Sequence, residues 1–263
     1  MATPVLPFEA DITISRVPKI GRGMFHAALV LLFILFSAAP LSFAQGHRSI
    51  PEQIEWTWEV RPSHPDPKLP NVLLLGDSIT RNYYPGVVHG LDGRANVYLF
   101  ATSASVGDPR LPDEVRQFYA MESVRFGIVH FNNGMHGWGY SEEQYKEAFP
   151  GFLKVVRSMA KSGRLIWATT TPVKSDASNG ASNPRIDARN EIAKAILTSH
   201  SIAIDDQHTL MSHHSDMYRD SVHFNDAGAS IQAAQVIAGV EVALQNLIKD
   251  SGDAAKVNTP KGR

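Results

Sequence analysis

A serine near the start of the chain and an aspartate–histidine pair near its end have the side chains that nucleophilic catalysis requires. Ser78 follows a run of four apolar residues and a Gly-Asp pair, and Asp220 and His223 lie three positions apart. Side chains at i and i+3 share one face of a helical turn. Asp220 can therefore orient the imidazole of His223, and that imidazole can take the proton of a serine hydroxyl.

Each of these motifs also has an ordinary structural interpretation. Asp77 or Ser78 could cap the helix expected over Ile79–Leu91, and Asp220 with His223 could form a surface pair. The start of a helix also offers free backbone N–H groups and partial positive charge, both of which stabilise an oxyanion. Taken singly, the motifs leave the two interpretations open.

Together, the two motifs resemble those of the SGNH (GDSL) serine hydrolases. The resemblance rests on "GDSIT" near the start of the domain and on "DSVH" followed by "FNDAG" near its end, and it covers about Asn71 to Ile248. It implies that Ser78 is the nucleophile and that Asp220 and His223 complete a catalytic triad. It also implies ester hydrolysis through an acyl-serine intermediate, with no metal ion or organic cofactor.

Two middle motifs of that family supply oxyanion donors, a backbone glycine N–H and an asparagine side chain, and they match less closely here. In "FATSASVGD", Ser103 or Ala104 occupies the place of the glycine in the family's Asn-x-Gly pattern. A backbone N–H needs no glycine where φ and ψ permit, so either residue is an expected donor. Gly107 and the aspartate after it resemble the tail of the motif. The N–H group of Ser78 is a further expected donor.

The asparagine of the family's Gly-x-Asn-Asp pattern has more than one possible counterpart in "GIVHFNNGMHGW". Matching by strand length places His136 in the asparagine position, whereas matching by residue type favours Asn132 or Asn133. An imidazole N–H can donate to an oxyanion as an amide N–H does. We expect His136 to be the donor, with Asn132 as a supporting residue.

Short apolar runs alternate with helical segments between the two outer motifs, which predicts an α/β fold. Continuous apolar character is typical of strands buried on both faces of a parallel sheet. The expected architecture is a three-layer α/β/α sandwich with a mostly parallel five-stranded sheet, SGNH hydrolase-like and flavodoxin-like. Ligands bind such sheets at the carboxyl ends of the strands. The five strands are expected at Val72–Leu75, Asn96–Ala101, Phe126–Phe131, Arg164–Thr169 and Ser201–Ile204.

Capping residues and prolines mark the expected helices. Ser141 and Gln144 form a capping box, and Pro150 predicts a kink or break inside the helix that follows them. A last helix is expected to begin after a cap at Asn225 or Asp226, within "FNDAG", and to run to about residue 249.

The N-terminal sequence predicts an export signal. Met24–Ala44 carries no Lys, Arg, Asp or Glu, follows Lys19 and Arg22, and ends in small residues suited to a signal peptidase. Its length is also close to that of a membrane span, so an uncleaved anchor is the alternative. We expect a secreted or periplasmic protein, tethered to a membrane only if this segment is retained. The expected organisation is a signal or membrane segment (1–44), an extended arm (45–70), an SGNH hydrolase domain (71–249) and a flexible tail (250–263).

Composition and spacing exclude several other classes of protein. The formal net charge of −1 gives no general attraction to nucleic acid, and the absence of cysteine excludes disulfides and thiolate metal sites. His208, His213, His214 and Asp216 have side chains that bind zinc, but their spacing matches no H-E-x-x-H pattern. We expect a solvated loop there and no metal site.

These observations predict an exported serine esterase that hydrolyses carboxylic esters, with O-acetyl groups of glycans as a plausible substrate class. Its expected partner is a small-molecule or glycan ester. Trp138 and Tyr140 could stack on a sugar ring or could simply pack within their loop. The alternatives are a catalytically inactive module that binds glycans or proteins, a short-chain lipase or thioesterase, and a membrane-tethered structural protein whose Gly-Asp-Ser only caps a helix.

Overall fold

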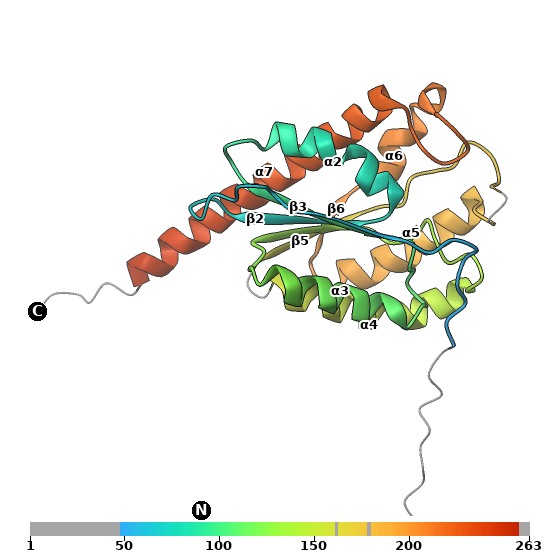
Figure 1. Ribbon diagram of the computed structural model, residues 1–263, viewed down its shortest axis with the longest axis horizontal. Helices are drawn as coiled ribbons and strands as arrows, with labels where there is room; N and C mark the ends of the chain where they lie inside the picture. Colours follow the sequence, from blue (N-terminus) through green and yellow to red (C-terminus); the bar gives the residue numbers. More distant parts are fainter. Residues whose placement is uncertain (1–47, 161–162, 178–179, 258–263) are drawn as a thin grey trace, which may run out of the picture. The chain divides into compact units, whose positions relative to one another are not determined.

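A mostly parallel sheet of six strands lies between two layers of helices (Figure 1). The computed structural model describes residues 48–160, 163–177 and 180–257, so the predicted signal segment lies outside the described residues. The strand order is β1-β3-β2-β4-β5-β6, and β1 alone in this sheet runs antiparallel to its neighbour. Helices α2, α6 and α7 cover one face, and α3, α4 and α5 cover the other. The predicted three-layer α/β class is confirmed.

The elements follow one another in the order expected of repeated strand–helix units. The strands are β1 (Thr57–Val60), β2 (Asn71–Gly76), β3 (Asn96–Thr102), β4 (Ile128–Phe131), β5 (Arg164–Ala168) and β6 (Ala203–Asp205). The helices are α2 (Ser78–Gly90), α3 (Arg110–Glu122), α4 (Glu142–Ala160), α5 (Asn183–Thr198), α6 (Gln207–Ser212), the 3₁₀-helix η1 (Ser215–Met217) and α7 (Asp226–Val257).

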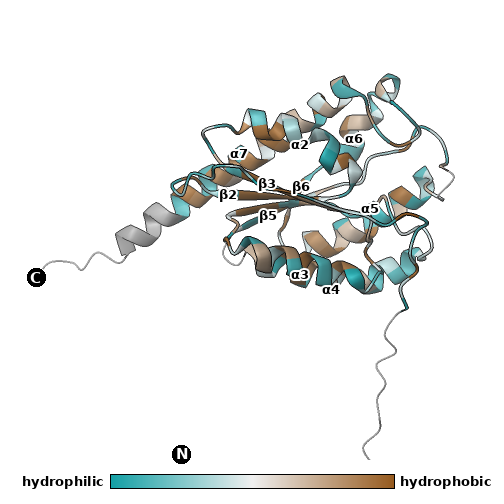
Figure 2. Cartoon of the chain, in the orientation of Figure 1, coloured by the Kyte–Doolittle hydropathy of each residue, from teal (hydrophilic) through white to brown (hydrophobic). Residues whose placement is uncertain are grey.

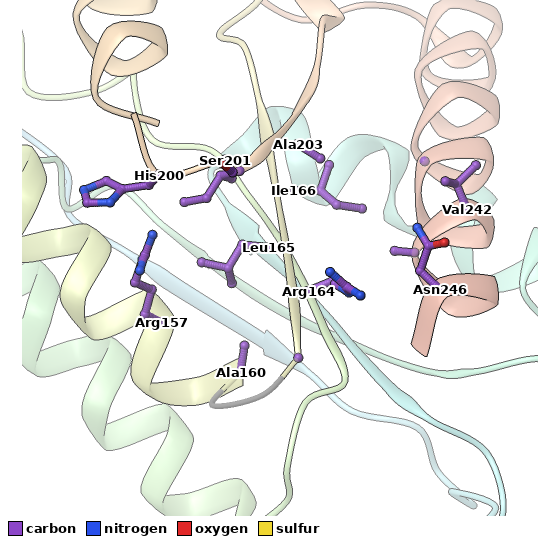
Figure 3. Close-up of a pocket in the computed structure, with 14 residues that line it drawn as sticks. Arg157, Ala160, Arg164, Leu165, Ile166, His200, Ser201, Ala203, Val242 and Asn246 are labelled. Carbon is purple, nitrogen blue, oxygen red and sulfur yellow. The ribbon is translucent and has the colours of Figure 1, made fainter. Parts of the chain in front are cut away.

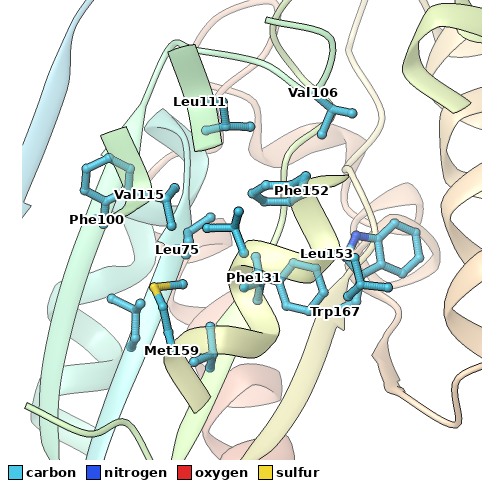
Figure 4. Close-up of a cluster of buried hydrophobic side chains, with 14 of the residues drawn as sticks. Leu75, Phe100, Val106, Leu111, Val115, Phe131, Phe152, Leu153, Met159 and Trp167 are labelled. Atoms are coloured by element: carbon cyan, nitrogen blue, oxygen red, sulfur yellow. The ribbon is translucent and has the colours of Figure 1, made fainter. Parts of the chain in front are cut away.

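Alternate side chains of β2 enter two separate hydrophobic clusters because successive residues of a strand point to opposite faces. Leu73 and Leu75 pack with residues of α3 and α4, whereas Val72 and Leu74 pack with residues of α2 and α7. The strands are accordingly the most hydrophobic part of the fold (Figure 2), and Figure 4 shows Leu75 among side chains of β4, β5 and α4. Each fully buried leucine contributes about 1.5–3 kcal/mol to stability.

The sheet has a sixth strand that the sequence did not predict. β1 lies within residues 45–70, the stretch expected to be an extended arm, and pairs with β3 from Thr57↔Thr102 to Val60↔Leu99. The side chains of Thr57, Trp58 and Glu59 are exposed, so the strand lacks the apolar pattern that marks the other five. It therefore adds an edge to the sheet through backbone hydrogen bonds, with little burial of its own side chains.

Helix α4 confirms the predicted capping box and has no break at Pro150. The Ser141 N–H donates to Gln144 Oε1 at 2.9 Å, and the Gln144 N–H donates to Ser141 Oγ at 3.2 Å. The helix then continues past Pro150 as one element, rather than breaking there. Phe149 and Phe152 are buried on either side of the proline, and their packing offsets the hydrogen bond that a proline cannot make.

Helix α7 begins where the sequence predicted and ends later. Asn225 caps it, because the N–H of Gly228 donates to Asn225 Oδ1 at 3.0 Å. The helix extends to Val257, so the first part of the predicted tail is helical. By length and composition Asp226–Asp250 could span a membrane. One face of it packs on the sheet, as in a core helix, through Ala229, Ala233, Val236, Val240 and Ala243.

The parallel strands bring the predicted motifs to one edge of the sheet. β2, β3 and β4 are neighbours and run in the same direction, so their carboxyl ends lie together. "GDS" begins at the last residue of β2, "SASVGD" follows β3 and "NNGMH" follows β4. This edge is where ligands bind in sheets of this kind.

Candidate active site

Ser78 is the first residue of α2, and a different residue caps the helix. The carboxylate of Asp77 accepts a hydrogen bond from the N–H of Ile79 at 2.9 Å, which leaves the Ser78 hydroxyl free for another partner. A Cβ on Gly76 would lie only 2.1 Å from Thr80 Oγ1, so the tight entry from β2 into the helix requires glycine. Asp77 therefore fulfils the capping interpretation, and Ser78 remains available for chemistry.

The structure brings the three predicted triad residues together across 145 positions of sequence. His223 Nε2 lies 2.7 Å from Ser78 Oγ. On the other side of the ring, His223 Nδ1 lies 3.0 Å and 3.1 Å from the two carboxylate oxygens of Asp220. A carboxylate only accepts hydrogen bonds, so Nδ1 carries the hydrogen and Nε2 accepts from the serine hydroxyl. This is the arrangement of a general base beside its nucleophile.

Asp220 is fixed by its own turn as well as by the imidazole. Its Oδ1 accepts hydrogen bonds from the N–H groups of Val222 at 2.8 Å and His223 at 2.7 Å. Burial acts to raise the pKa of Asp220, but these hydrogen bonds and the one with the His223 ring outweigh it and hold the pKa below its ordinary value. Asp220 is therefore a carboxylate at neutral pH.

Ser103 and Ala104 are not free to donate to an oxyanion, which corrects the sequence prediction. The Ser103 N–H donates to the carbonyl of Trp56 at 3.0 Å, and the Ala104 N–H donates to Thr102 Oγ1 at 3.0 Å. In the same loop, the N–H of Gly107 has no hydrogen-bond partner among the described residues. Gly107 has a φ of +106°, a backbone conformation that favours glycine. This residue, at the tail of the motif after β3, is therefore a more suitable donor than Ser103 or Ala104.

Asn132 and Asn133 hold the site together through hydrogen bonds to the neighbouring loops. The amide of Asn132 donates to the carbonyl of Ala168 at 2.6 Å and to Thr170 Oγ1 at 3.1 Å, which uses both of its hydrogens. Asn133 joins the loop after β3, accepting from the Val106 N–H at 2.7 Å and donating to the Ala104 carbonyl at 2.9 Å. The alignment by residue type is therefore wrong for Asn132, whose amide is fully occupied.

His136 keeps one ring nitrogen unpaired. Its Nδ1 lies 2.9 Å from Glu52 Oε2, and its Nε2 is buried with no hydrogen-bond partner among the described residues. Burial acts to lower the pKa of His136, but the hydrogen bond with Glu52 and the charges of Asp77, Glu52 and Glu55 outweigh it and raise the pKa. Because Nδ1 must donate to Glu52, Nε2 can donate only when the ring is an imidazolium.

The segment before β1 lies along this edge of the sheet, which the sequence did not indicate. Besides binding His136, Glu52 accepts a hydrogen bond from the Gly137 N–H at 2.9 Å. Glu55 accepts from Ser103 Oγ at 2.6 Å and from Arg110 at 2.9 Å. These contacts link residues about 50 to 85 positions apart, and no local pattern predicts them.

The aromatic residues proposed for sugar stacking have structural roles instead. Trp138 and Tyr140 are buried. The guanidinium of Arg189 lies 4.1 Å from the centre of the Trp138 ring, and the Tyr140 hydroxyl accepts from the Ile50 N–H at 2.6 Å. The loop-packing alternative is therefore correct for both residues. Trp58 on β1 is the aromatic side chain left exposed close to α2, with 51% of its surface accessible.

Other candidate sites lie apart from Ser78. In the described ranges, no three His, Asp or Glu side chains come together as metal ligands, and His208 pairs with Asp187 at 3.1 Å. A cavity of about 460 Å³ lies at the amino ends of β5 and β6, the edge of the sheet opposite Ser78. Figure 3 shows Arg157, Arg164 and His200 around it.

Comparison with known proteins supports the fold. No protein-family model matches the chain, and no curated protein sequence matches it. Among solved structures, a member of the lipolytic G-D-S-L family from Veillonella parvula is 18% identical, with a TM-score of 0.52 over 64% of this chain and 96% of its own. A carbohydrate esterase family 3 structure from Talaromyces cellulolyticus is 17% identical, with a TM-score of 0.52 over 68% of this chain and 99% of its own. An acetyl esterase has the same identity and TM-score, over 68% of this chain and all of its own.

At these identities the similarity establishes the fold. The chain has the α/β/α architecture of GDSL-type (SGNH) proteins, and the resemblance inferred from its motifs is confirmed at that level.

Glu52→Gln is expected to lower the pKa of His136, because it removes the carboxylate that binds Nδ1. An NMR titration of the His136 ring in the full chain measures this change. A histidine whose pKa is raised on folding stabilises the folded state at pH values below its ordinary pKa. This stabilisation is lost as the pH rises through the pKa of the folded state. The variant should therefore be less stable than the wild type at acidic and neutral pH, and nearly as stable at alkaline pH.

Glu55→Gln is the matched control, since Glu55 binds Ser103 and Arg110, and it should shift the pKa of His136 less. An unchanged titration in Glu52→Gln would show that Glu52 does not set the charge of His136.

Proposed function

We propose that this protein is a serine esterase that hydrolyses carboxylic esters through an acyl-serine intermediate. The observation that carries the proposal is the chain of contacts from Ser78 Oγ through the His223 ring to Asp220. It lies at the carboxyl edge of the sheet and at the start of α2. The same fold in an acetyl esterase and in a carbohydrate esterase supports this class of reaction.

The proposed mechanism follows from the hydrogen-bond directions. Ser78 Oγ attacks the ester carbonyl while His223 Nε2 takes its proton, and Asp220 stabilises the imidazolium that forms. The same proton passes to the leaving alcohol, which departs and leaves an acyl group on Ser78. His223 then takes a proton from water, whose oxygen attacks the acyl carbonyl. The bond between that carbon and Ser78 Oγ breaks, His223 returns the proton to Ser78 Oγ, and the acid is released.

Three groups are proposed to stabilise the oxyanion. The Ser78 N–H is at the start of α2 and has no hydrogen-bond partner among the described residues. The Gly107 N–H is the second donor, in place of Ser103 or Ala104, which the sequence predicted. His136 Nε2–H is the third donor, and Glu52 and Asp77 favour the imidazolium form that it requires.

Export and a glycan O-acetyl substrate complete the proposal. The uncharged segment Met24–Ala44 supports secretion or a periplasmic location, with a membrane tether as the alternative. The intact contacts of Ser78, Asp220 and His223 argue against a catalytically inactive binding module.

Ser78→Ala is expected to abolish both ester hydrolysis and labelling by a fluorophosphonate probe, because the probe reacts with activated serine hydroxyls. Labelling of the purified full chain, followed by peptide mass spectrometry, identifies the modified residue. Circular dichroism of the variant confirms that it is folded. Folded wild-type protein that takes no label would rule out an activated serine.

His136→Ala is expected to lower kcat for p-nitrophenyl acetate by about 10²–10³, the usual effect of removing one oxyanion donor. KM should change little, because the interaction forms mainly in the transition state. His208→Ala is a matched control, since His208 also pairs with a carboxylate, and it should retain the wild-type kcat. If His136→Ala kept the wild-type kcat while remaining folded, His136 would not be a donor.

A further inference from the structure

The side chain next to the nucleophile on α2 is an arginine. Arg81 lies three residues after Ser78, and both belong to α2. Residues at i and i+3 of a helix share a face, with about 5–6 Å between their Cβ atoms. A substrate whose ester carbonyl reaches Ser78 therefore passes close to the Arg81 side chain.

Two tryptophans hold the Arg81 guanidinium in place. Its central carbon lies 4.9 Å from the centre of the Trp58 ring and 5.5 Å from that of Trp56. Trp56 in turn packs edge-on against His136, with 5.8 Å between the ring centres. A guanidinium stacked on aromatic faces keeps the N–H groups at its edge free to bind a carboxylate. The arginine is thus positioned in advance, and less conformational entropy is lost when it binds a ligand.

The charge of Arg81 is not neutralised within the described part of the chain. No carboxylate there lies within ion-pair distance of Arg81, whereas Arg110 and Arg116 each pair with one. The acidic residues of the neighbouring segment are already engaged, Glu52 with His136 and Glu55 with Arg110. An exposed, oriented cation therefore remains beside the nucleophile.

We propose that the ester substrate carries a carboxylate on or next to its acylated sugar unit and that Arg81 binds this carboxylate. The proposal rests on the esterase function proposed above. The planar fork of a guanidinium matches the two oxygens of a carboxylate, which favours this group over a neutral hydroxyl. Trp58, half of whose surface is exposed, offers a flat apolar face beside the same arginine for the ring of the sugar. The predicted substrate class is an O-acetylated acidic glycan.

Steady-state kinetics on two O-acetylated oligosaccharides test the proposal, an oligogalacturonate and a galacto-oligosaccharide of equal acetylation. The wild-type full chain should prefer the acidic substrate by about tenfold or more in kcat/KM, and added salt should reduce the preference. Arg81→Gln should remove the preference, mainly through KM. Arg116→Gln, an exposed arginine on α3, should keep it. Equal kcat/KM on the two substrates in the wild type, or an unchanged preference in Arg81→Gln, would overturn the proposal.

A binding measurement separates this inference from the function on which it rests. Calorimetric titration with unacetylated oligogalacturonate needs no turnover, and it should show binding that Arg81→Gln weakens about tenfold or more. Binding that depends on Arg81, without hydrolysis of any ester, would support the acidic ligand and contradict the esterase. Ester hydrolysis without binding of the acidic ligand would support the esterase and contradict the role of Arg81.

Discussion

The hydrogen bond between His223 Nε2 and Ser78 Oγ is the contact on which the candidate site depends, because it joins two residues 145 positions apart. The position of each residue is set by a different part of the fold. Ser78 is set by β2 and by the start of α2, whereas His223 is set by a turn that leads into α7. The two helices lie on the same face of the sheet, and Asn82 on α2 donates to the carbonyl of Phe224, next to His223, at 3.0 Å. The packing of α2 against α7 therefore maintains the distance that proton transfer requires.

A second group of contacts fixes the loops that follow β3 and β4. Asn132 ties the end of β4 to the end of β5, and Asn133 ties it to the loop after β3. The segment before β1 adds Glu52, whose carboxylate binds both His136 and the following glycine N–H. These side chains are buried or partly buried, and their hydrogen bonds offset the cost of removing polar groups from water. Asparagine and glutamate side chains thus make this part of the site rigid. Among the described residues, the N–H groups of Ser78 and Gly107 and Nε2 of His136 have no hydrogen-bond partner.

The sequence predicted the parts of this arrangement that depend on local patterns. Ser78, Asp220 and His223 stood within short motifs beside a buried strand and a helix start, and the structure brings them together. β1 was missed because its exposed side chains show no apolar alternation. The prediction that Ser103 or Ala104 donates to the oxyanion was wrong because other groups already accept from their N–H groups. The Ser103 N–H donates to the carbonyl of Trp56, a tertiary contact, and the Ala104 N–H donates to the nearby Thr102 hydroxyl. The pairing of Glu52 with His136 spans 84 positions, and no spacing rule anticipates it.

The most direct test of the central claim is to trap the acyl group on Ser78. The full chain would be mixed with p-nitrophenyl acetate, quenched with acid during turnover and digested, and the peptide containing Ser78 would be analysed by mass spectrometry. The contacts of Ser78, His223 and Asp220 predict an acetyl group on Ser78 that disappears when the ester is exhausted. Hydrolysis of the ester with no acetyl group on Ser78, or with the acetyl group on another residue, would contradict the account.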